Sequence, residues 1–167
     1  LSMLPDETTG TLAMNARAFE AFLARDVDAG GLALRRKPHA ARKALRPGAG
    51  VVATDVCVPI SRLADCVTET EDDLKRLGLL SPIVGHVGDG NFHCSLVCDV
   101  DNAEEMARGE DFMHRLVERA QSMGGTCTGE HGVGQGKQKY LKAELGPEAI
   151  DAMRALKQAL DPQNIFN

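Results

Sequence analysis

Two histidines at the ends of a short glycine-rich stretch have the spacing of a metal site. The stretch runs from residue 85 to residue 93 and reads Gly-His-Val-Gly-Asp-Gly-Asn-Phe-His. An Asp-Gly pair between apolar β-formers predicts a β-hairpin, because a type I′ turn needs a positive φ at both central positions. With Asp89 and Gly90 as the turn, His86 pairs with His93, and their Cβ atoms lie about 4.5–5.5 Å apart on one face. Two imidazoles at that separation can bind one metal ion.

A third ligand is available in the Gly-Glu-His-Gly sequence at residues 129–132. We expect the backbone here to continue a short strand, in which neighbouring side chains point to opposite sides. If Glu130 faces the metal, His131 then faces elsewhere and is available for acid–base chemistry. Two histidines and one carboxylate leave an open coordination position for a substrate or water, as a catalytic metal site requires. A single histidine is more often an ordinary core or surface residue, so the hypothesis depends on the predicted pairing.

Two further polar residues belong to the predicted hairpin. Asn91 lies at the turn, and Ser95 follows two residues after His93, on the same face of the strand. Both are candidates for contacts with a substrate. His39 and His114 have no comparable neighbours, and we interpret them as ordinary residues.

The hairpin needs a sheet around it, and the hydrophobic periodicity predicts one. Strands are predicted over residues 51–58, 81–87, 91–99 and 126–128, and helices over 61–78, 102–123, 137–145 and 147–160. Pro147 at a first helical turn separates the last two helices. The order β-α-β-β-α-β is typical of a ferredoxin-like α+β fold, in which an antiparallel sheet carries helices on one face. The C-terminal helices would be additions to that arrangement.

The composition excludes several classes of function. A formal net charge of −5, with no long basic run, argues against nucleic-acid binding, and no run of apolar residues is long enough to span a membrane. The five cysteines are odd in number and include no Cys-x-x-Cys pair, which fits a reduced, cytoplasmic or otherwise intracellular location. We interpret Cys94 and Cys98 as small apolar core residues. The first residues lack the basic and apolar regions expected of a signal peptide. Because the chain does not begin with Met, we expect a fragment or a processed piece.

Four motifs carry a resemblance to a known family. They are Thr-Asp-Val-Cys-Val-Pro at 54–59, the stretch 85–93, Gly-Glu-His-Gly-Val-Gly at 129–134, and Leu-Asp-Pro at 160–162 with Asn167. They resemble the C-terminal domain of FAD-linked D-2-hydroxy-acid dehydrogenases, in the vanillyl-alcohol-oxidase class. Among these enzymes, the D-lactate dehydrogenase (cytochrome) and glycolate oxidase group has the motif sequences most similar to those of this chain. The resemblance covers about residues 46–167, whereas residues 1–45 match poorly and are predicted to be helical or irregular.

The resemblance implies a set of site residues. A divalent metal, zinc or manganese, would be bound by His86, His93 and Glu130. His131 would be the base that takes the substrate hydroxyl proton, and Asn91 would help to place the substrate. An arginine upstream of the first motif would hold the substrate carboxylate; counting along the chain indicates Arg35, with Arg36 as the alternative.

The resemblance also implies what the chain needs from outside. FAD would be bound mainly by a separate FAD-binding domain, joined in cis or bound in trans, and without it this chain would be inactive. The enzyme would oxidise a D-2-hydroxy acid to the 2-oxo acid, with D-lactate first and glycolate or D-2-hydroxyglutarate as other substrates. Any association with a membrane would come through the parent enzyme. The alternative is a ferredoxin-like module that binds a metal or a carboxylate without redox chemistry.

Overall fold

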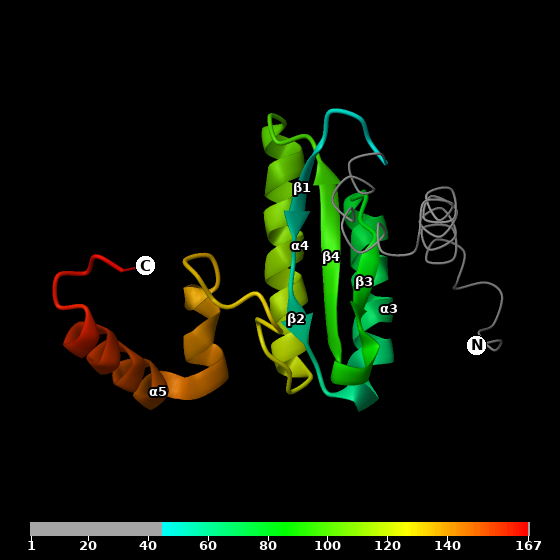
Figure 1. The fold of residues 1–167 in the computed structure, drawn as a ribbon. Coiled ribbons are helices and arrows are strands. Elements are labelled where there is room, and N and C mark those ends of the chain that lie inside the picture. Colours follow the sequence, from blue (N-terminus) through cyan, green and yellow to red (C-terminus); the bar gives the residue numbers. More distant parts are fainter. Residues whose placement is uncertain (1–44, 167) are drawn as a thin grey trace, which may run out of the picture. The chain divides into compact units, whose positions relative to one another are not determined.

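The computed structural model describes residues 45–166, which form an α+β fold with a small antiparallel sheet and three helices (Figure 1). The strands are β1 (Gly50–Ala53), β2 (Val56–Cys57), β3 (Ile83–His86) and β4 (Asn91–Cys98), and the helices are α3 (Ile60–Leu77), α4 (Ala103–Ser122) and α5 (Gln138–Leu160). Strand β4 pairs with each of the other strands. The predicted fold class, α+β, is confirmed. The predicted carboxylate-binding Arg35 and its alternative lie outside the described residues.

The described residues divide into two compact units, and α3, α4, β3 and β4 have residues in both. The first unit consists of residues 45–54, 67–84 and 93–113, and the second of residues 55–66, 85–92 and 114–166. None of the described helices is long and apolar enough to traverse a lipid bilayer.

The core of the first unit forms between β4 and α4. Strand β1 runs antiparallel to β4, with Gly50 opposite Cys98 and Ala53 opposite Ser95. Leu96 of β4 and Phe112 of α4 are almost completely buried. Gly109 of α4 lies against this strand, since a Cβ atom there would be 3.5 Å from Leu96 Cδ1. Cys94 and Cys98 are buried and take part in no disulfide, which confirms their interpretation as core residues.

A buried carboxylate secures the start of α4 in the first unit. Glu105 is 7% exposed, and its Oε1 accepts a hydrogen bond from Arg46 Nη1 at 2.6 Å. Its Oε2 accepts a hydrogen bond from the Asp99 backbone N–H at 3.2 Å. The Glu105 backbone N–H donates to Asn102 Oδ1, so Asn102 caps the helix, as its residue type predicts. The hydrogen bond from Arg46 lowers the pKa of Glu105.

We predict that Glu105→Gln lowers the melting temperature at pH 7 and that this deficit shrinks as the pH falls. A carboxylate with a lowered folded-state pKa stabilises the protein above its unfolded value, here 4.5, and loses that contribution as the pH falls through the folded value. Thermal unfolding followed by circular dichroism from pH 7 to about pH 3 measures the difference. The neighbouring, exposed Glu104→Gln is the matched control. An equal, pH-independent deficit in both variants would contradict the assignment.

The predicted strand over residues 51–58 is interrupted at its middle, so its continuity was predicted wrongly. Strand β1 ends at Ala53, and β2 contains Val56 and Cys57 alone. At the break the Cys94 backbone N–H donates to the Thr54 hydroxyl rather than to a backbone carbonyl. This bond takes the place of a ladder hydrogen bond, and Asp55 is left outside the strands.

In the second unit, β2 pairs antiparallel with the start of β4, with Val56 opposite Phe92 and Cys57 opposite Asn91. The predicted fourth strand at 126–128 is reduced to one bridge between Cys57 and Thr126. The residues of this unit with the least exposed side chains are Val56, Cys66, Leu116, Ala120 and Cys127.

The two-residue turn was also predicted wrongly. Residues Val87–Asp89 form a 3₁₀ turn, and in this loop the positive φ, +73°, is found at Gly90 and not at Asp89. A Cβ atom on Gly85 would lie 2.7 Å from Phe92 Cα, so Gly85 faces Phe92 across the strands, and antiparallel register then sets His86 opposite Asn91. The physical reason lies in Gly90, where a Cβ atom would be 2.0 Å from the Val58 carbonyl oxygen. This close approach to the chain after β2 determines the loop geometry.

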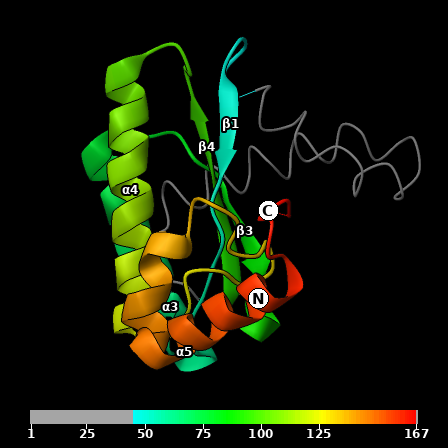
Figure 2. The same ribbon diagram turned by 90° about the vertical axis from the view of Figure 1, so that its left-hand side faces the viewer.

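The break predicted between residues 145 and 147 is present as a kink in α5. Gly146 has φ +83° and ψ 165°, which is non-helical, and Pro147 begins the second segment. Figure 2 shows the change of helix direction in the orange part of the ribbon. The second segment exposes apolar side chains to solvent, namely Met153, Leu156 and Leu160.

Candidate metal centre

His86 and Glu130 meet in the second unit. His86 Nε2 lies 3.6 Å from Glu130 Oε1, and the two side chains are 60% and 51% exposed. Two ligand atoms that each lie about 2.1 Å from one tetrahedral ion are separated by about 3.4 Å. The observed distance therefore fits two ligands of the same ion with little movement.

His131 also lies near this carboxylate oxygen. Its Nε2 is 3.9 Å from Glu130 Oε1, and its side chain is 48% exposed. The extended backbone predicted for this segment was wrong, because the backbone N–H groups of Gly129, Glu130 and His131 all donate to one oxygen. Successive N–H groups of a strand point in opposite directions, whereas those of a curled loop can converge. Glu130 and His131 are thus held by a curled loop and both lie near His86.

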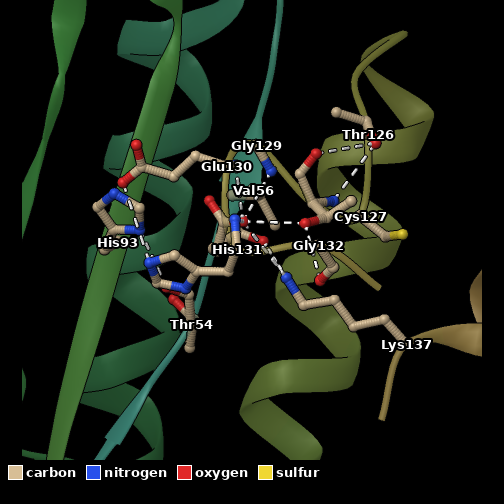
Figure 3. A network of polar contacts seen from close by, with 12 residues as sticks. Thr54, Val56, His93, Thr126, Cys127, Gly129, Glu130, His131, Gly132 and Lys137 are labelled. Atoms are coloured by element: carbon tan, nitrogen blue, oxygen red, sulfur yellow. Dashed lines mark hydrogen bonds and ion pairs between the residues drawn. The ribbon is translucent and has the colours of Figure 1, made fainter. Parts of the chain in front are cut away.

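The atom on which these N–H groups converge is Oδ2 of Asp55. Figure 3 shows the polar network that contains the labelled Gly129, Glu130 and His131. The distances from the nitrogens of Gly129, Glu130 and His131 are 2.9, 3.0 and 2.8 Å. The Thr128 hydroxyl donates to the same oxygen at 3.0 Å. The Asp55 side chain is 1% exposed. The loop is therefore built around an internal anion.

Asp55 is charged despite its burial. Burial raises the pKa of the carboxyl group, but hydrogen bonds from the His131 backbone, the Asn91 amide, the Glu130 backbone and the Thr128 hydroxyl outweigh it. The net result is a pKa far below the ordinary value for aspartate. Lys137 Nζ supplies a cation 3.8 Å from Asp55 Oδ2 and donates to the Asp55 backbone carbonyl at 2.6 Å. Burial lowers the pKa of Lys137, and the charge of Asp55 opposes that shift.

Asn91 joins β4 to the same carboxylate. Its Nδ2 donates to Asp55 Oδ1 at 2.8 Å and to the Val56 carbonyl at 3.0 Å, and the residue is 5% exposed. No described residue donates a hydrogen bond to Asn91 Oδ1. The Ser95 hydroxyl, in the first unit, likewise has no hydrogen-bond partner among the described residues. These two buried, unpaired oxygen atoms belong to the two residues that the sequence suggests for substrate contacts.

His93 belongs to the first unit and is 8% exposed. Its Nδ1 lies 3.2 Å from the Thr54 carbonyl oxygen. A carbonyl oxygen can only accept, so Nδ1 carries the proton in this contact, and Nε2 is the nitrogen with a lone pair. A backbone carbonyl that orients the ring in this way is the usual partner of a metal-binding histidine.

Sequence reasoning missed Asp55 and Lys137. A signal for Asp55 was present, because a carboxylate inside the apolar run 51–58 must find partners when it is buried. No comparable signal exists for Lys137, whose role depends on the folding of the loop between residues 128 and 137.

Comparisons with known proteins agree with these motifs. Residues 9–167 match the sequence model of the family described as FAD linked oxidases, C-terminal domain. Over 127 residues the chain is 53% identical to the Probable D-lactate dehydrogenase, mitochondrial, of Danio rerio, which covers 76% of this chain and 26% of that protein. It is 44% identical over 134 residues to the D-lactate dehydrogenase [cytochrome], mitochondrial, of Arabidopsis thaliana, covering 80% and 24%. It is 41% identical over 133 residues to the Glycolate oxidase subunit GlcD of Bacillus subtilis, covering 80% and 28%. The chain thus spans about a quarter of the length of these relatives.

Proposed function

Because this chain belongs to the family of C-terminal domains of FAD-linked oxidases, we propose that it is the substrate- and metal-binding domain of an FAD-dependent dehydrogenase. The enzyme oxidises a D-2-hydroxy acid to the 2-oxo acid. D-lactate is the first candidate substrate, in line with the names of the similar proteins from Danio rerio and Arabidopsis thaliana. Glycolate and D-2-hydroxyglutarate are the other candidates.

The proposed metal ligands are His86, His93 and Glu130. The observation that carries the proposal is the 3.6 Å separation of His86 Nε2 and Glu130 Oε1, which suits two ligands of one ion. The hydrogen-bonded Nδ1 of His93, which leaves Nε2 as the ring nitrogen with a lone pair, supports the third ligand. Nitrogen and oxygen donors of this kind suit zinc or manganese.

The remaining roles are those that the family resemblance implies. The metal would lower the pKa of the substrate hydroxyl, and the flavin would accept hydride. His131 accepts the hydroxyl proton at a ring nitrogen, which requires a neutral imidazole. Arg35 holds the substrate carboxylate through a bidentate pair, and Asn91 and Ser95 contact the substrate.

FAD is held mainly by a separate domain, in cis or in trans. The side chains of His86, Glu130 and His131 are about half exposed, so this site is open to solvent within its own unit. A hydride transfer requires that water be excluded. A covering FAD-binding domain supplies that exclusion.

We further propose that the fold is ferredoxin-like. The bridge between Cys57 and Thr126 stands where the order β-α-β-β-α-β places a fourth strand. Thr126 N–H donates to the Cys57 carbonyl at 2.8 Å, and Cys57 N–H donates to the Thr126 carbonyl at 3.3 Å.

The metal site is tested by calorimetric titration of the metal-free chain with Zn²⁺. We expect one ion per chain, and we expect His86→Ala, His93→Ala and Glu130→Gln each to lower the affinity by about 100-fold or more. The matched control is His114→Ala, because His114 Nε2 also lies near a carboxylate, 3.3 Å from Glu118 Oε1, and is 51% exposed. Absence of binding by the native chain, or an equal loss in His114→Ala, would contradict the proposal.

The substrate class is tested on the same proteins. D-lactate is expected to raise the melting temperature of the metal-loaded chain, and L-lactate to raise it less, because ligands that bind only the folded state stabilise it. His86→Ala is expected to abolish the difference between the two isomers.

A further inference from the structure

We propose that Asp55 is the positioning residue of this site: its carboxylate acts as the internal anion on which the loop 128–132 folds, so that Glu130 and His131 are presented to the metal and the substrate. The effect of Asp55 on metal binding rests on the proposed function. The hydrogen bonds that shape the loop do not depend on that function.

The first step is the shape of the loop. Three successive backbone N–H groups, from Gly129 to His131, point at Asp55 Oδ2, and the Thr128 hydroxyl joins them. Successive N–H groups that converge in this way form an anion-binding concavity. Here a side chain of the same protein fills the concavity. The carboxylate thereby determines the curvature of the segment that carries Glu130 and His131.

The second step is how Asp55 is itself held in place. Oδ1 accepts from the Asn91 amide, and the Asp55 backbone carbonyl accepts from Lys137 Nζ. Asn91 begins β4, and Lys137 immediately precedes α5. The two partners therefore fix Asp55 to the sheet and to the end of the loop. Movement of the carboxylate would require several buried hydrogen bonds to break together.

The third step is the effect on the metal ligand. Glu130 Oε1 lies 3.6 Å from His86 Nε2 and 3.9 Å from His131 Nε2. These side chains are half exposed, so packing alone does not hold them. The backbone of Glu130 and His131 is held by Asp55 instead. Partners that orient metal ligands typically change metal affinity by about 10–100-fold when they are removed.

The experiment has two arms, both on the full 167-residue chain. In the first arm, amide hydrogen exchange is measured by NMR without metal. Asp55→Asn, which replaces the anion by a neutral group of the same shape, is expected to accelerate exchange at Gly129, Glu130 and His131 by more than about tenfold relative to other amides. In the second arm, Co²⁺ is titrated, and its visible absorption reports the ligand set. Asp55→Asn is expected to weaken Co²⁺ binding by about 10–100-fold and to change the spectrum.

The control is Asp151→Asn, because Asp151 is an exposed aspartate that pairs with Arg154. It removes the same charge and is expected to leave both arms unchanged. Should Asp55→Asn fail to fold, Lys137→Met replaces it: this variant keeps the carboxylate but removes one anchor, and a several-fold acceleration of exchange at the same three amides is expected.

The outcomes separate the two proposals. The positioning role is overturned if the amides of residues 129–131 exchange in Asp55→Asn at the same rate as in the native chain. The same outcome in Lys137→Met overturns it if Asp55→Asn does not fold. Accelerated exchange with an unchanged Co²⁺ affinity and spectrum also overturns it, because the loop would then not control the ligand. If the native chain binds no Co²⁺, the proposed metal site fails, and the exchange arm alone decides whether Asp55 holds the loop.

Discussion

Gly129→Ala is expected to destabilise the protein by about 3 kcal/mol and to lower its melting temperature by roughly 6–12 °C. A Cβ atom at this position would lie 1.7 Å from Asn91 Nδ2 and 2.8 Å from Asp55 Oδ1. Side chains can move away from a clash when they are flexible and exposed. Asn91 is neither, because it is 5% exposed and donates two hydrogen bonds.

The same substitution is expected to damage the candidate metal centre. Room for the new methyl group requires the Asn91 amide to leave Asp55 or the Gly129 backbone to withdraw from Asp55 Oδ2. Either movement leaves a buried polar group with one partner fewer and displaces Glu130, the next residue along the chain. We therefore expect Zn²⁺ affinity to fall together with stability.

The matched control lies in the same glycine-rich segment. Gly136 has no positive φ, and a methyl group added at that position would have no atom of the described residues within 4 Å. Gly136→Ala is expected to raise the free energy of unfolding by less than about 1 kcal/mol, because alanine lowers the conformational entropy of the unfolded chain. Urea unfolding and Zn²⁺ titration of both variants measure the contrast. Similar behaviour of the two alanine variants would contradict the described loop geometry.

Phe112→Ala is expected to cost about 3–5 kcal/mol, the usual range for removing a buried aromatic side chain. Phe112 on α4 has no exposed surface and belongs to the core of the first unit. The substitution removes its apolar contacts and leaves a cavity that the surrounding side chains can fill only partly. Partial or complete unfolding at ordinary temperatures is therefore expected.

Phe166→Ala makes the same chemical change at an exposed position, because Phe166 is 69% exposed. It is expected to shift the free energy of unfolding by less than about 0.5 kcal/mol. Equilibrium denaturation in urea measures both variants. A loss in Phe166→Ala as large as that in Phe112→Ala would show that the assignment of the core is wrong.

Much of the fold was predictable because its signals are local. The helices α3 and α4 follow the periodicity of their apolar residues, and the kink in α5 follows from Gly146 and Pro147. The pairing of strands was less predictable. The Asp-Gly pair favoured a two-residue turn, but Gly90 packs against the Val58 carbonyl, and the loop became a 3₁₀ turn.

The candidate site divides in the same way. The identities of His86, Glu130 and His131 were visible in their motifs, and the structure brings these three residues together. The predicted register and the predicted extended backbone were both wrong: His86 lies opposite Asn91, and Glu130 lies in a curled loop. The metal ligands are a proposal, which the titrations test.

The amino-acid sequence by itself predicted the helices α3 and α4, the kink in α5 and the burial of Cys94 and Cys98, and it named the candidate site residues. These properties depend on residue types and on spacings within one or two turns of the chain. The tertiary structure alone decided the strand register and the role of Asp55. The donors from residues 128–131 reach Asp55 across 73 to 76 residues of sequence, and a contact of that range leaves no periodic pattern in the chain.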